Sequence, residues 1–116
     1  MSRTSERALQ EPTLLVLTAL ADEPRHGYAI TREVKALSGG RVVLRTGTLY
    51  GALDRLVRDG LIEVLREEIV DGRARKIYTL AAPGRERLAV EAERLAATAR
   101  EARRRLEASG PAGAPA

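Results

Sequence analysis

Two groups of basic and hydroxyl side chains in this sequence could bind the phosphates of a nucleic acid. The first group surrounds one predicted helix and consists of Arg45, Thr46, Thr48, Tyr50, Arg55 and Arg58. The second group follows Asp71-Gly72 and consists of Arg73, Arg75 and Lys76. Arginine and lysine form charge-assisted hydrogen bonds with phosphate oxygens, and hydroxyl groups add contacts to phosphates or base edges. The spacing therefore predicts a DNA-binding surface made from a helix and a turn.

The distribution of charge supports this interpretation more than its total, which is +4. Residues 1–40 carry five basic and five acidic side chains and are neutral overall. Residues 41–60 carry four arginines against two aspartates, and residues 71–76 carry three basic side chains against one acid. The excess falls on the two contact elements and on the C-terminal helix, a pattern that favours DNA binding. Any one of these segments alone is equally consistent with an ordinary solvated surface.

The helix that carries the first group is predicted over residues 47–59. Its leucines recur at helical spacing on one side, and its arginines fall on the opposite side. Thr46 is a candidate N-cap, whose hydroxyl would accept a hydrogen bond from a backbone N–H of the first turn. Gly47 and Gly51 add no side chain to the exposed side of the helix, which favours close approach of a partner. Gly60 ends the helix.

The second group lies in a predicted β-hairpin. Residues 63–69 and 76–80 are typical of strands, and the basic glycine turn at residues 71–74 joins them. A capped amphipathic helix followed by a strand, a basic turn and a second strand is the order of a winged helix, in which the hairpin loop is the wing.

Two shorter helices are predicted before these contact elements. Residues 13–21 form a heavily apolar helix, which begins after Glu11-Pro12. Residues 26–37 form an amphipathic helix, which Ser38-Gly39-Gly40 ends. The β-branched residues 41–44 could form a small strand.

The last helix is predicted over residues 83–108 and carries a heptad seam. The apolar positions of this seam alternate at intervals of four and three, and they are Leu88, Ala92, Leu95, Ala99, Ala102 and Leu106. No other element in the chain is left to cover such a helix, so the seam predicts a homodimer.

The predicted fold class is therefore mainly α with a small β-hairpin, a winged helix-turn-helix followed by a long C-terminal dimerisation helix. Residues 1–10 are predicted to be a flexible arm, and residues 11–82 the DNA-binding domain. Residues 83–108 would form the dimerisation helix, and the Gly/Pro/Ala-rich residues 109–116 a disordered tail.

Several other functions are not expected. The chain has no cysteine and one histidine, so no zinc or thiolate site is predicted. No phosphate loop or dinucleotide glycine pattern is present, and Glu67 and Glu68 would point to opposite faces of a strand. We therefore expect no enzyme, catalytic residue, metal or cofactor. The longest apolar run is too short to cross a membrane and no signal peptide is visible, so a cytoplasmic location is expected.

Three aromatic or titratable residues have two interpretations each. His26 is predicted to be a structural residue at the start of the second helix rather than a ligand. Tyr28 is predicted to lie in the core or to support the backbone rather than to read a base. Tyr50 could pack on the wing, but its place in the first turn of the helix over residues 47–59 favours a DNA contact.

The combined motifs resemble the PadR family of transcriptional regulators over roughly residues 12–90. The matching segments are Leu14 to Leu20, His26-Gly27-Tyr28, Gly47-Thr48-Leu49-Tyr50 with Ala52-Leu53 and Leu56, Gly60-Leu61-Ile62, and Gly72 to Tyr78. The resemblance implies a winged-helix dimer that binds palindromic operator DNA, mostly as a repressor. It also implies that small molecules, often phenolic or drug-like, relieve repression. A single C-terminal helix resembles the shorter of the two PadR groups, in which the last helix makes the dimer.

The chain differs from the usual family pattern at four points. Arg45-Thr46 stands where Ser-Pro is common, Gly51 replaces a frequent proline, and Ala74 replaces the proline of the wing. None of these three differences removes a contact group, and Arg45 adds one, so they bear on which operator is read. The chain also has no tryptophan, so its seam offers only Leu and Ala where relatives stack flat ligands on aromatic rings.

We therefore expect a homodimeric repressor whose partners are double-stranded DNA, a second copy of the chain, and a small aromatic or drug-like effector. The helix over residues 47–59 would enter the major groove, with half-sites about one helical turn, or about 34 Å, apart. One alternative is a winged-helix module that binds protein through its long arginine-rich helix and does not bind DNA specifically. Another is a small-molecule sensor whose effector is essential.

Overall fold

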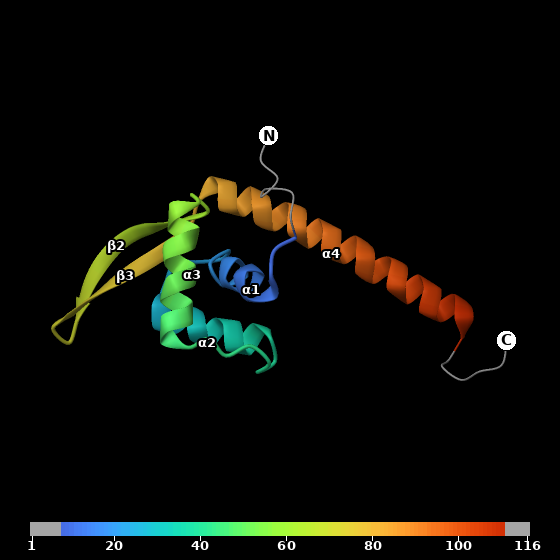
Figure 1. The fold of residues 1–116 in the computed structure, drawn as a ribbon, viewed down its shortest axis with the longest axis horizontal. Coiled ribbons are helices and arrows are strands. Elements are labelled where there is room, and N and C mark those ends of the chain that lie inside the picture. Colours follow the sequence, from blue (N-terminus) through green and yellow to red (C-terminus); the bar gives the residue numbers. More distant parts are fainter. Residues whose placement is uncertain (1–7, 111–116) are drawn as a thin grey trace.

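The computed structural model describes residues 8–110. Their elements, in chain order, are α1 (Glu11–Ala19), β1 (Arg25–His26), α2 (Gly27–Leu37), α3 (Thr46–Arg58), β2 (Ile62–Val70), β3 (Arg73–Leu80) and α4 (Ala82–Ser109). Figure 1 shows α1, α2 and α3 gathered in one body, with the β2–β3 hairpin extending from one side and α4 from the other. The predicted fold class, mainly helical with a small β-hairpin, is confirmed. Most of the predicted arm and most of the predicted tail lie outside the described residues.

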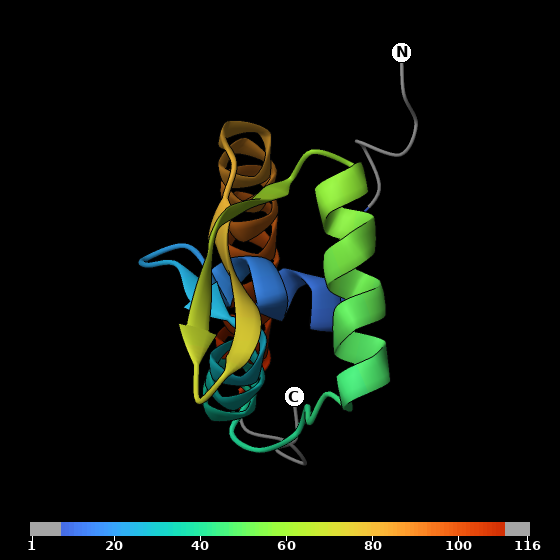
Figure 2. The same ribbon diagram turned by 90° about the vertical axis from the view of Figure 1, so that its left-hand side faces the viewer.

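One aliphatic core joins the three short helices to the base of the hairpin. Each element contributes side chains that are almost fully buried: Val16, Leu17 and Leu20 of α1 and its end, Ile30 and Val34 of α2, Leu49, Leu53 and Leu56 of α3, and Ile62, Tyr78 and Leu80 of the hairpin. Burying one such aliphatic side chain contributes about 1.5–3 kcal/mol relative to leaving it exposed. The leucine stripe of α3 is therefore anchored to the body, which leaves the opposite side of this helix free. Figure 2 shows α3 at one edge of the molecule, with the other elements on one side of it.

The sheet has three antiparallel strands in the order β1-β3-β2. The first strand is the short β1, where Arg25 pairs with Tyr78 and His26 pairs with Ile77. The prediction of a small strand over residues 41–44 is wrong. That segment is held instead by the Ser38 hydroxyl oxygen, which accepts a hydrogen bond from the backbone N–H of Val42 at 2.9 Å.

The hairpin turn consists of two residues, Asp71 and Gly72. Both residues have positive φ, 52° and 76°. The residues that flank the turn, Val70 and Arg73, pair with each other across the two strands. Two central residues with positive φ are what a tight turn needs to match the twist of its strands, and Asp-Gly is a favoured sequence for it. Strand β3 therefore begins at Arg73, earlier in the chain than predicted. The basic residues Arg73, Arg75 and Lys76 lie on this strand and not in a loop.

Gly84 lets α4 approach the body more closely than any other residue would. A Cβ atom at this position would lie 2.0 Å from the carbonyl oxygen of Leu61, a backbone atom that cannot easily move. We expect Gly84→Ala to lower the free energy of unfolding by about 2–3 kcal/mol, because overpacking forces a backbone shift.

Urea unfolding checks this prediction, with Gly51→Ala as the matched control. Gly51 is exposed inside α3, and a Cβ there would meet nothing within 4 Å. The control should therefore stabilise the protein by roughly 0.5–1 kcal/mol, since alanine is the better helix former. Equal stability of the two variants would contradict the close approach at Gly84.

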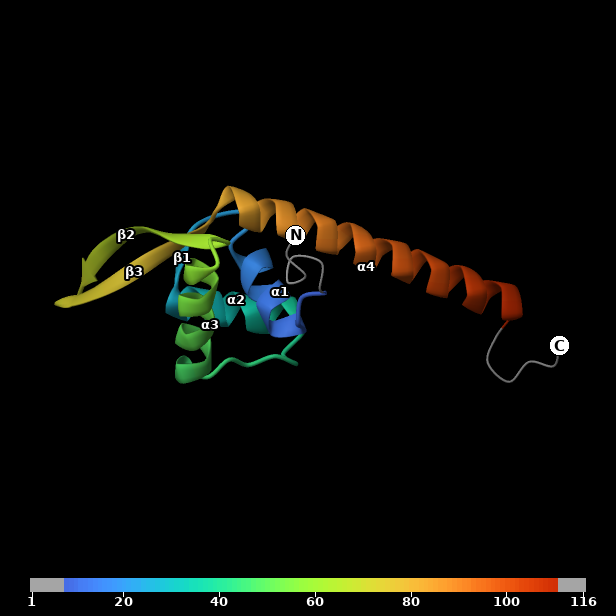
Figure 3. The ribbon, with the colours of Figure 1, turned by 45° about the horizontal axis from the view of Figure 1, so that its top comes forward.

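The two halves of α4 have different surroundings. Gly84, Leu88 and Glu91 near its start face the body, and the buried Glu91 carboxylate accepts a hydrogen bond from the backbone N–H of Leu9 at 3.3 Å and pairs with Arg94. The second half projects past the body, as Figures 1 and 3 show. At 1.5 Å per residue, this 28-residue helix is about 42 Å long. No helix in the described part of the chain combines the length and the apolar character needed to cross a membrane.

Candidate nucleic-acid interface

The free side of α3 presents most of the first predicted group. Thr46, Thr48, Arg55 and Arg58 are all exposed on this helix, and Arg45 is exposed immediately before it. The prediction that Thr46 caps the helix is wrong. Arg45 is the N-cap residue, its carbonyl oxygen accepts from the N–H of Leu49 at 2.8 Å, and no side chain makes a cap hydrogen bond. The first N–H groups of α3 therefore remain available to an acceptor outside the chain.

Tyr50 lies between α3 and the start of α2. Its side chain is 41% exposed, and its hydroxyl lies so close to Gly27 that a Cβ at Gly27 would be 2.3 Å from the oxygen. Burial raises the pKa of the neighbouring Tyr78, and the charges of Tyr50 and Asp54 raise it further, so these groups lie near one another. Tyr50 thus helps to set the position of α3 against α2 and keeps part of its ring accessible.

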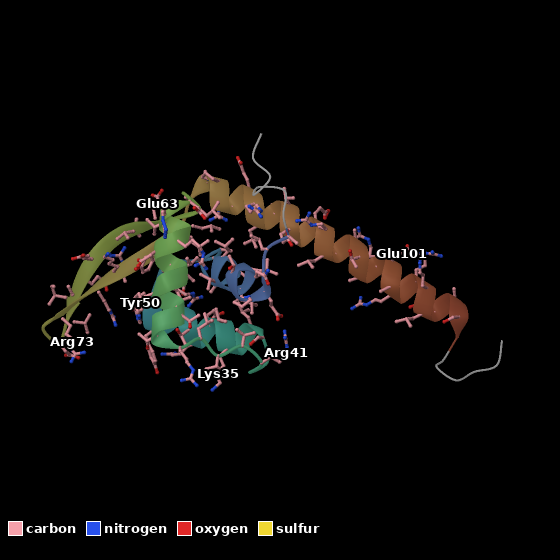
Figure 4. The ribbon with its side chains drawn as sticks, viewed as in Figure 1. Lys35, Arg41, Tyr50, Glu63, Arg73 and Glu101 are labelled. Atoms are coloured by element: carbon pink, nitrogen blue, oxygen red, sulfur yellow. The ribbon has the colours of Figure 1, made fainter. Side chains whose placement is uncertain are left out.

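The wing carries the second predicted group along β3. Arg73 lies at the tip, as Figure 4 shows, and Lys76 is exposed further down the strand. Because side chains alternate along a strand, Arg73 and Arg75 share one face and Lys76 lies on the other. Arg75 is only partly exposed, and its buried Nε has no hydrogen-bond partner among the described residues. The structure therefore separates the three basic groups that the sequence placed together.

Several arginines outside the predicted contact residues are held in ion pairs. They include Arg25, Arg41, Arg66, Arg94, Arg104 and Arg105, which lie before α2, after α2, on β2 and on α4. In the part of the chain that the structure describes, none of the basic residues predicted to contact DNA has an ion pair. Asp54 is the single acid of α3. The predicted contact residues of α3 and the wing therefore carry positive charges that are not held in ion pairs of the described chain, although Glu67 and Glu68 lie opposite Lys76 and Arg75 in the strand pairing. Such charges suit a polyanion.

A groove of about 490 Å³ runs between the start of α1 and the free side of α3. It is lined by Gln10, Pro12, Thr13 and Val16 on one side and by Leu44, Gly47, Thr48, Gly51, Ala52 and Arg55 on the other. A Cβ atom added at Gly47 or Gly51 would have nothing within 4 Å, so no side chain covers the backbone of α3 at this point. This agrees with the expectation that the two glycines permit close approach of a partner.

His26 is a structural residue, as predicted. It is the N-cap of α2, and its Nδ1 accepts a hydrogen bond from the backbone N–H of Ala29 at 3.3 Å. This bond requires Nδ1 without a proton, and therefore a neutral ring if the other nitrogen carries one. Burial lowers the pKa of His26 below its usual value, and the positive charges of Arg75 and Arg32 lower it further, against an opposite effect of Glu68.

The lowered pKa makes folding stability depend on pH. Between the folded value and the unfolded value of about 6.5, the unfolded chain binds more protons than the folded chain. The contribution of His26 is therefore complete above about pH 6.5 and is lost as the pH falls through the folded pKa. We expect the thermal midpoint to fall between pH 7.5 and 5.5, and to fall less in His26→Asn, because asparagine caps helices without titrating. An identical pH dependence in both proteins would contradict this role.

The exposed side of α2 was missed by the sequence reasoning. Tyr28 is 65% exposed, so its predicted place in the core is wrong. The guanidinium carbon of Arg32 lies 5.5 Å from the centre of its ring, and Lys35 is exposed one turn further on. The available signal was their spacing at i, i+4 and i+7, which places all three on one side of a helix.

The predicted dimerisation residues have two kinds of surroundings. Leu88 is partly buried against the core of its own chain. Leu95 and Leu106 are 48% and 68% exposed, and the alanines between and beside them, Ala92, Ala99 and Ala102, are exposed as well. The seam therefore begins on the body and continues without cover along the projecting half of α4.

Known proteins share both the sequence and the fold of this chain. The model of the transcriptional regulator PadR-like family matches residues 16–90. The transcriptional regulator Rv3488 of Mycobacterium tuberculosis is 41% identical over 88 residues, which cover 76% of this chain and 78% of that protein. An uncharacterized 37.1 kDa protein in transposon TN4556 of Streptomyces fradiae is 47% identical over 83 residues, or 72% of this chain, but the match spans only 22% of that longer protein.

A solved structure agrees with these matches. The Bacillus subtilis PadR structure, a complex with operator DNA, has a TM-score of 0.61 and 26% identity, covering 68% of this chain and 46% of that one. The family consists of regulators rather than enzymes, in agreement with the expected absence of catalysis. The family model covers well over half of the chain, and the helical and hairpin elements it spans are those of a winged helix. This chain belongs to the PadR-like family of transcriptional regulators.

Proposed function

We propose that the protein is a homodimeric repressor that binds a palindromic operator through α3 and the wing. The observation that carries this proposal is that the basic residues predicted to contact DNA lie on those two elements and have no ion pair within the described chain. In the proposed complex, α3 lies in the major groove with Thr48, Tyr50 and Arg55 toward the bases. Arg45 and Arg58 at its two ends, and Arg73 and Lys76 of the wing, contact phosphates.

The homodimer is supported by the seam of α4. Its exposed members, from Leu95 to Leu106, continue the same side of the helix that packs against the body at Leu88. The same seam on a second copy of the chain would cover them, and the alanines would allow the two helices to pack closely. A two-fold axis through the paired helices would present two α3 helices to DNA, which implies an inverted repeat.

Selection from a random duplex library tests the proposal without knowledge of the operator. The full chain at near-physiological salt, with competitor DNA, should enrich inverted repeats whose half-sites lie about 10–10.5 base pairs apart. Recovery of unrelated sequences after several rounds would contradict specific binding. It would favour the alternative, a winged-helix module that binds protein through the arginine-rich α4.

We also propose that the protein represses transcription and that a small molecule relieves this repression. A reporter gene placed behind the selected site should be transcribed less when the protein is present, and an increase would assign activation instead. A small aromatic or drug-like molecule would relieve repression, as the family resemblance implies. The exposed seam of α4 carries Leu and Ala but no aromatic ring, so such a molecule would be held by aliphatic contacts. Release of labelled operator by candidate compounds measures this relief.

A further inference from the structure

We propose that Glu91 is a positioning residue, which fixes the direction of the projecting half of α4 through its hydrogen bond to Leu9. In the proposed homodimer this direction sets the separation of the two α3 helices. The inference rests on the proposed dimer, and it gives a reason for the burial of a charged side chain at the point where α4 leaves the body.

Glu91 is the one charged residue that is almost fully buried in the described part of the chain, with 3% of its surface exposed. One carboxylate oxygen accepts a hydrogen bond from the backbone N–H of Leu9 at 3.3 Å, and the other pairs with Arg94. The hydrogen bond from Arg94 lowers the pKa of Glu91 and outweighs the opposite effect of burial, and the bond from Leu9 lowers it further. The side chain is therefore a buried carboxylate anion that is held on two sides.

Stability alone does not call for a carboxylate at this position, because apolar side chains of similar volume are often at least as stable as a buried ion pair. A buried polar group does restrict its surroundings, since its hydrogen-bond partners must stay in place. Leu9 is a partner with a fixed position. Its side chain packs against the core, and the carbonyl oxygen of the next residue, Gln10, accepts a hydrogen bond from the N–H of Leu14 in α1 at 2.9 Å. Glu91 thus ties α4 to the start of α1.

Glu91 is also the last buried residue of α4. Gly84, Leu88 and Glu91 lie at positions i, i+4 and i+7 on the side that faces the body, and the residues from Ala92 to Ser109 are all exposed. The contact from Gly84 to Glu91 is about 10 Å long, and about 27 Å of helix follows it. Figures 1 and 3 show α4 passing α1 and then continuing beyond the body.

A short contact that holds a long projection makes the direction of α4 sensitive to the last residue of the contact. A tilt of about 10° at Glu91 would move the end of α4 by about 5 Å, given the length of the projecting half. In the dimer the partner holds this half, so the same tilt moves the body and α3 relative to the partner. One base-pair step of DNA is about 3.4 Å, so such freedom would weaken the preference for one half-site spacing.

The test measures the distance between the two copies of α3 in the DNA-free dimer. The chain has no cysteine, so Asp59→Cys, at the exposed end of α3, gives one spin-labelling site per chain. Pulsed electron paramagnetic resonance then gives the distribution of distances between the two labels. Glu91→Leu removes the acceptor for the N–H of Leu9, and Glu91→Gln keeps one. Glu93→Leu is the matched control, because it makes the same exchange at an exposed position of α4 outside the seam.

Glu91→Leu should remain a dimer by light scattering, and its distance distribution should be shifted or broadened by about 5 Å or more. Glu91→Gln and the control should keep the narrow distribution of the wild-type protein. An unchanged distribution in Glu91→Leu, or loss of its dimer, would overturn the inference. Equal broadening in Glu91→Gln would overturn the role of the bond to Leu9.

A second variant breaks the same bond from the other side. Leu9→Pro removes the N–H donor and leaves Glu91 in place, so it should broaden the distribution in the same way. This variant decides the question if Glu91→Leu does not fold, and an unchanged distribution in Leu9→Pro would then count against the inference.

The same variants are compared on the selected operator and on duplexes with one base pair inserted or removed at its centre. The affinity of the wild-type protein should fall several-fold with either change, whereas Glu91→Leu should bind the three duplexes nearly equally. If Glu91→Leu selects one spacing as strictly as the wild-type protein does, the inference fails and the proposed function stands. A wild-type protein that is monomeric, or that selects no inverted repeat, would overturn the proposed function itself.

Discussion

Leu95→Glu is expected to turn the proposed dimer into a monomer and to weaken operator binding by about 100-fold or more. Leu95 is the first exposed leucine of the α4 seam, and pairing with a second copy would bury a glutamate at this position in an apolar contact. Binding two half-sites with two linked domains raises affinity by about 10²–10⁴ over a single domain, and this gain is lost in a monomer. Light scattering checks the mass against the 12.6 kDa of one chain.

Ala97→Glu is the matched control for this prediction. Ala97 is exposed on α4 two residues further on, and the helical spacing places it on the side opposite Leu95. It introduces the same negative charge outside the seam, so the control should remain dimeric and keep most of its operator affinity. A dimer that survives Leu95→Glu would show that another surface makes the contact between copies.

Arg73→Gln with Lys76→Gln is expected to weaken binding to every duplex by about the same factor, about tenfold or more at about 100 mM salt. Both side chains are exposed on the wing and have no ion pair in the described residues, so phosphates would be their first strong partners. Phosphate contacts carry no direct sequence information, so the ratio of specific to non-specific affinity should stay unchanged. Arg75 is left in place because its partly buried side chain also acts on His26.

A variant of α3 provides the contrast that makes the wing prediction specific. Thr48→Ala removes a hydroxyl from the exposed first turn of α3 and should lower the ratio of specific to non-specific affinity. A hydroxyl that reads a base contributes about 1–3 kcal/mol to the free-energy difference between specific and non-specific binding. If the wing variant loses specificity while the α3 variant does not, the two elements have exchanged the roles assigned to them.

The elements of the fold could be predicted from the sequence where their signals are local. The leucine stripe of α3, the Asp71-Gly72 turn and the glycines that follow α2 and α3 each depend on neighbours within one or two turns of chain. Their predicted positions agree with the structure to within a few residues. The strand β1 was missed because two residues carry no periodicity, and its partners in β3 lie some fifty residues away in the sequence.

The candidate site was predictable in composition but not in arrangement. Exposure of Tyr28 depends on how α2 packs against α1 and α3, so the prediction that this residue lies in the core or supports the backbone could not settle its exposure. The wing residues are separated because β3 starts at Arg73, so that Lys76 lies on the other face of the strand from Arg73 and Arg75, and the charge of Arg75 acts on His26. The close approach at Gly84 and the bond between Glu91 and Leu9 join segments distant in sequence, which no local pattern reveals.

The proposed arrangement, two copies of α3 in successive major grooves on one face of DNA, can be tested by changing the half-site spacing. Affinity is measured for the selected operator and for the same duplex with five base pairs inserted at its centre. Five base pairs are about half a helical turn, which carries the second half-site to the opposite face of the duplex. We expect the insertion to lower the affinity by about 100-fold or more. Equal affinity for the two duplexes would contradict it.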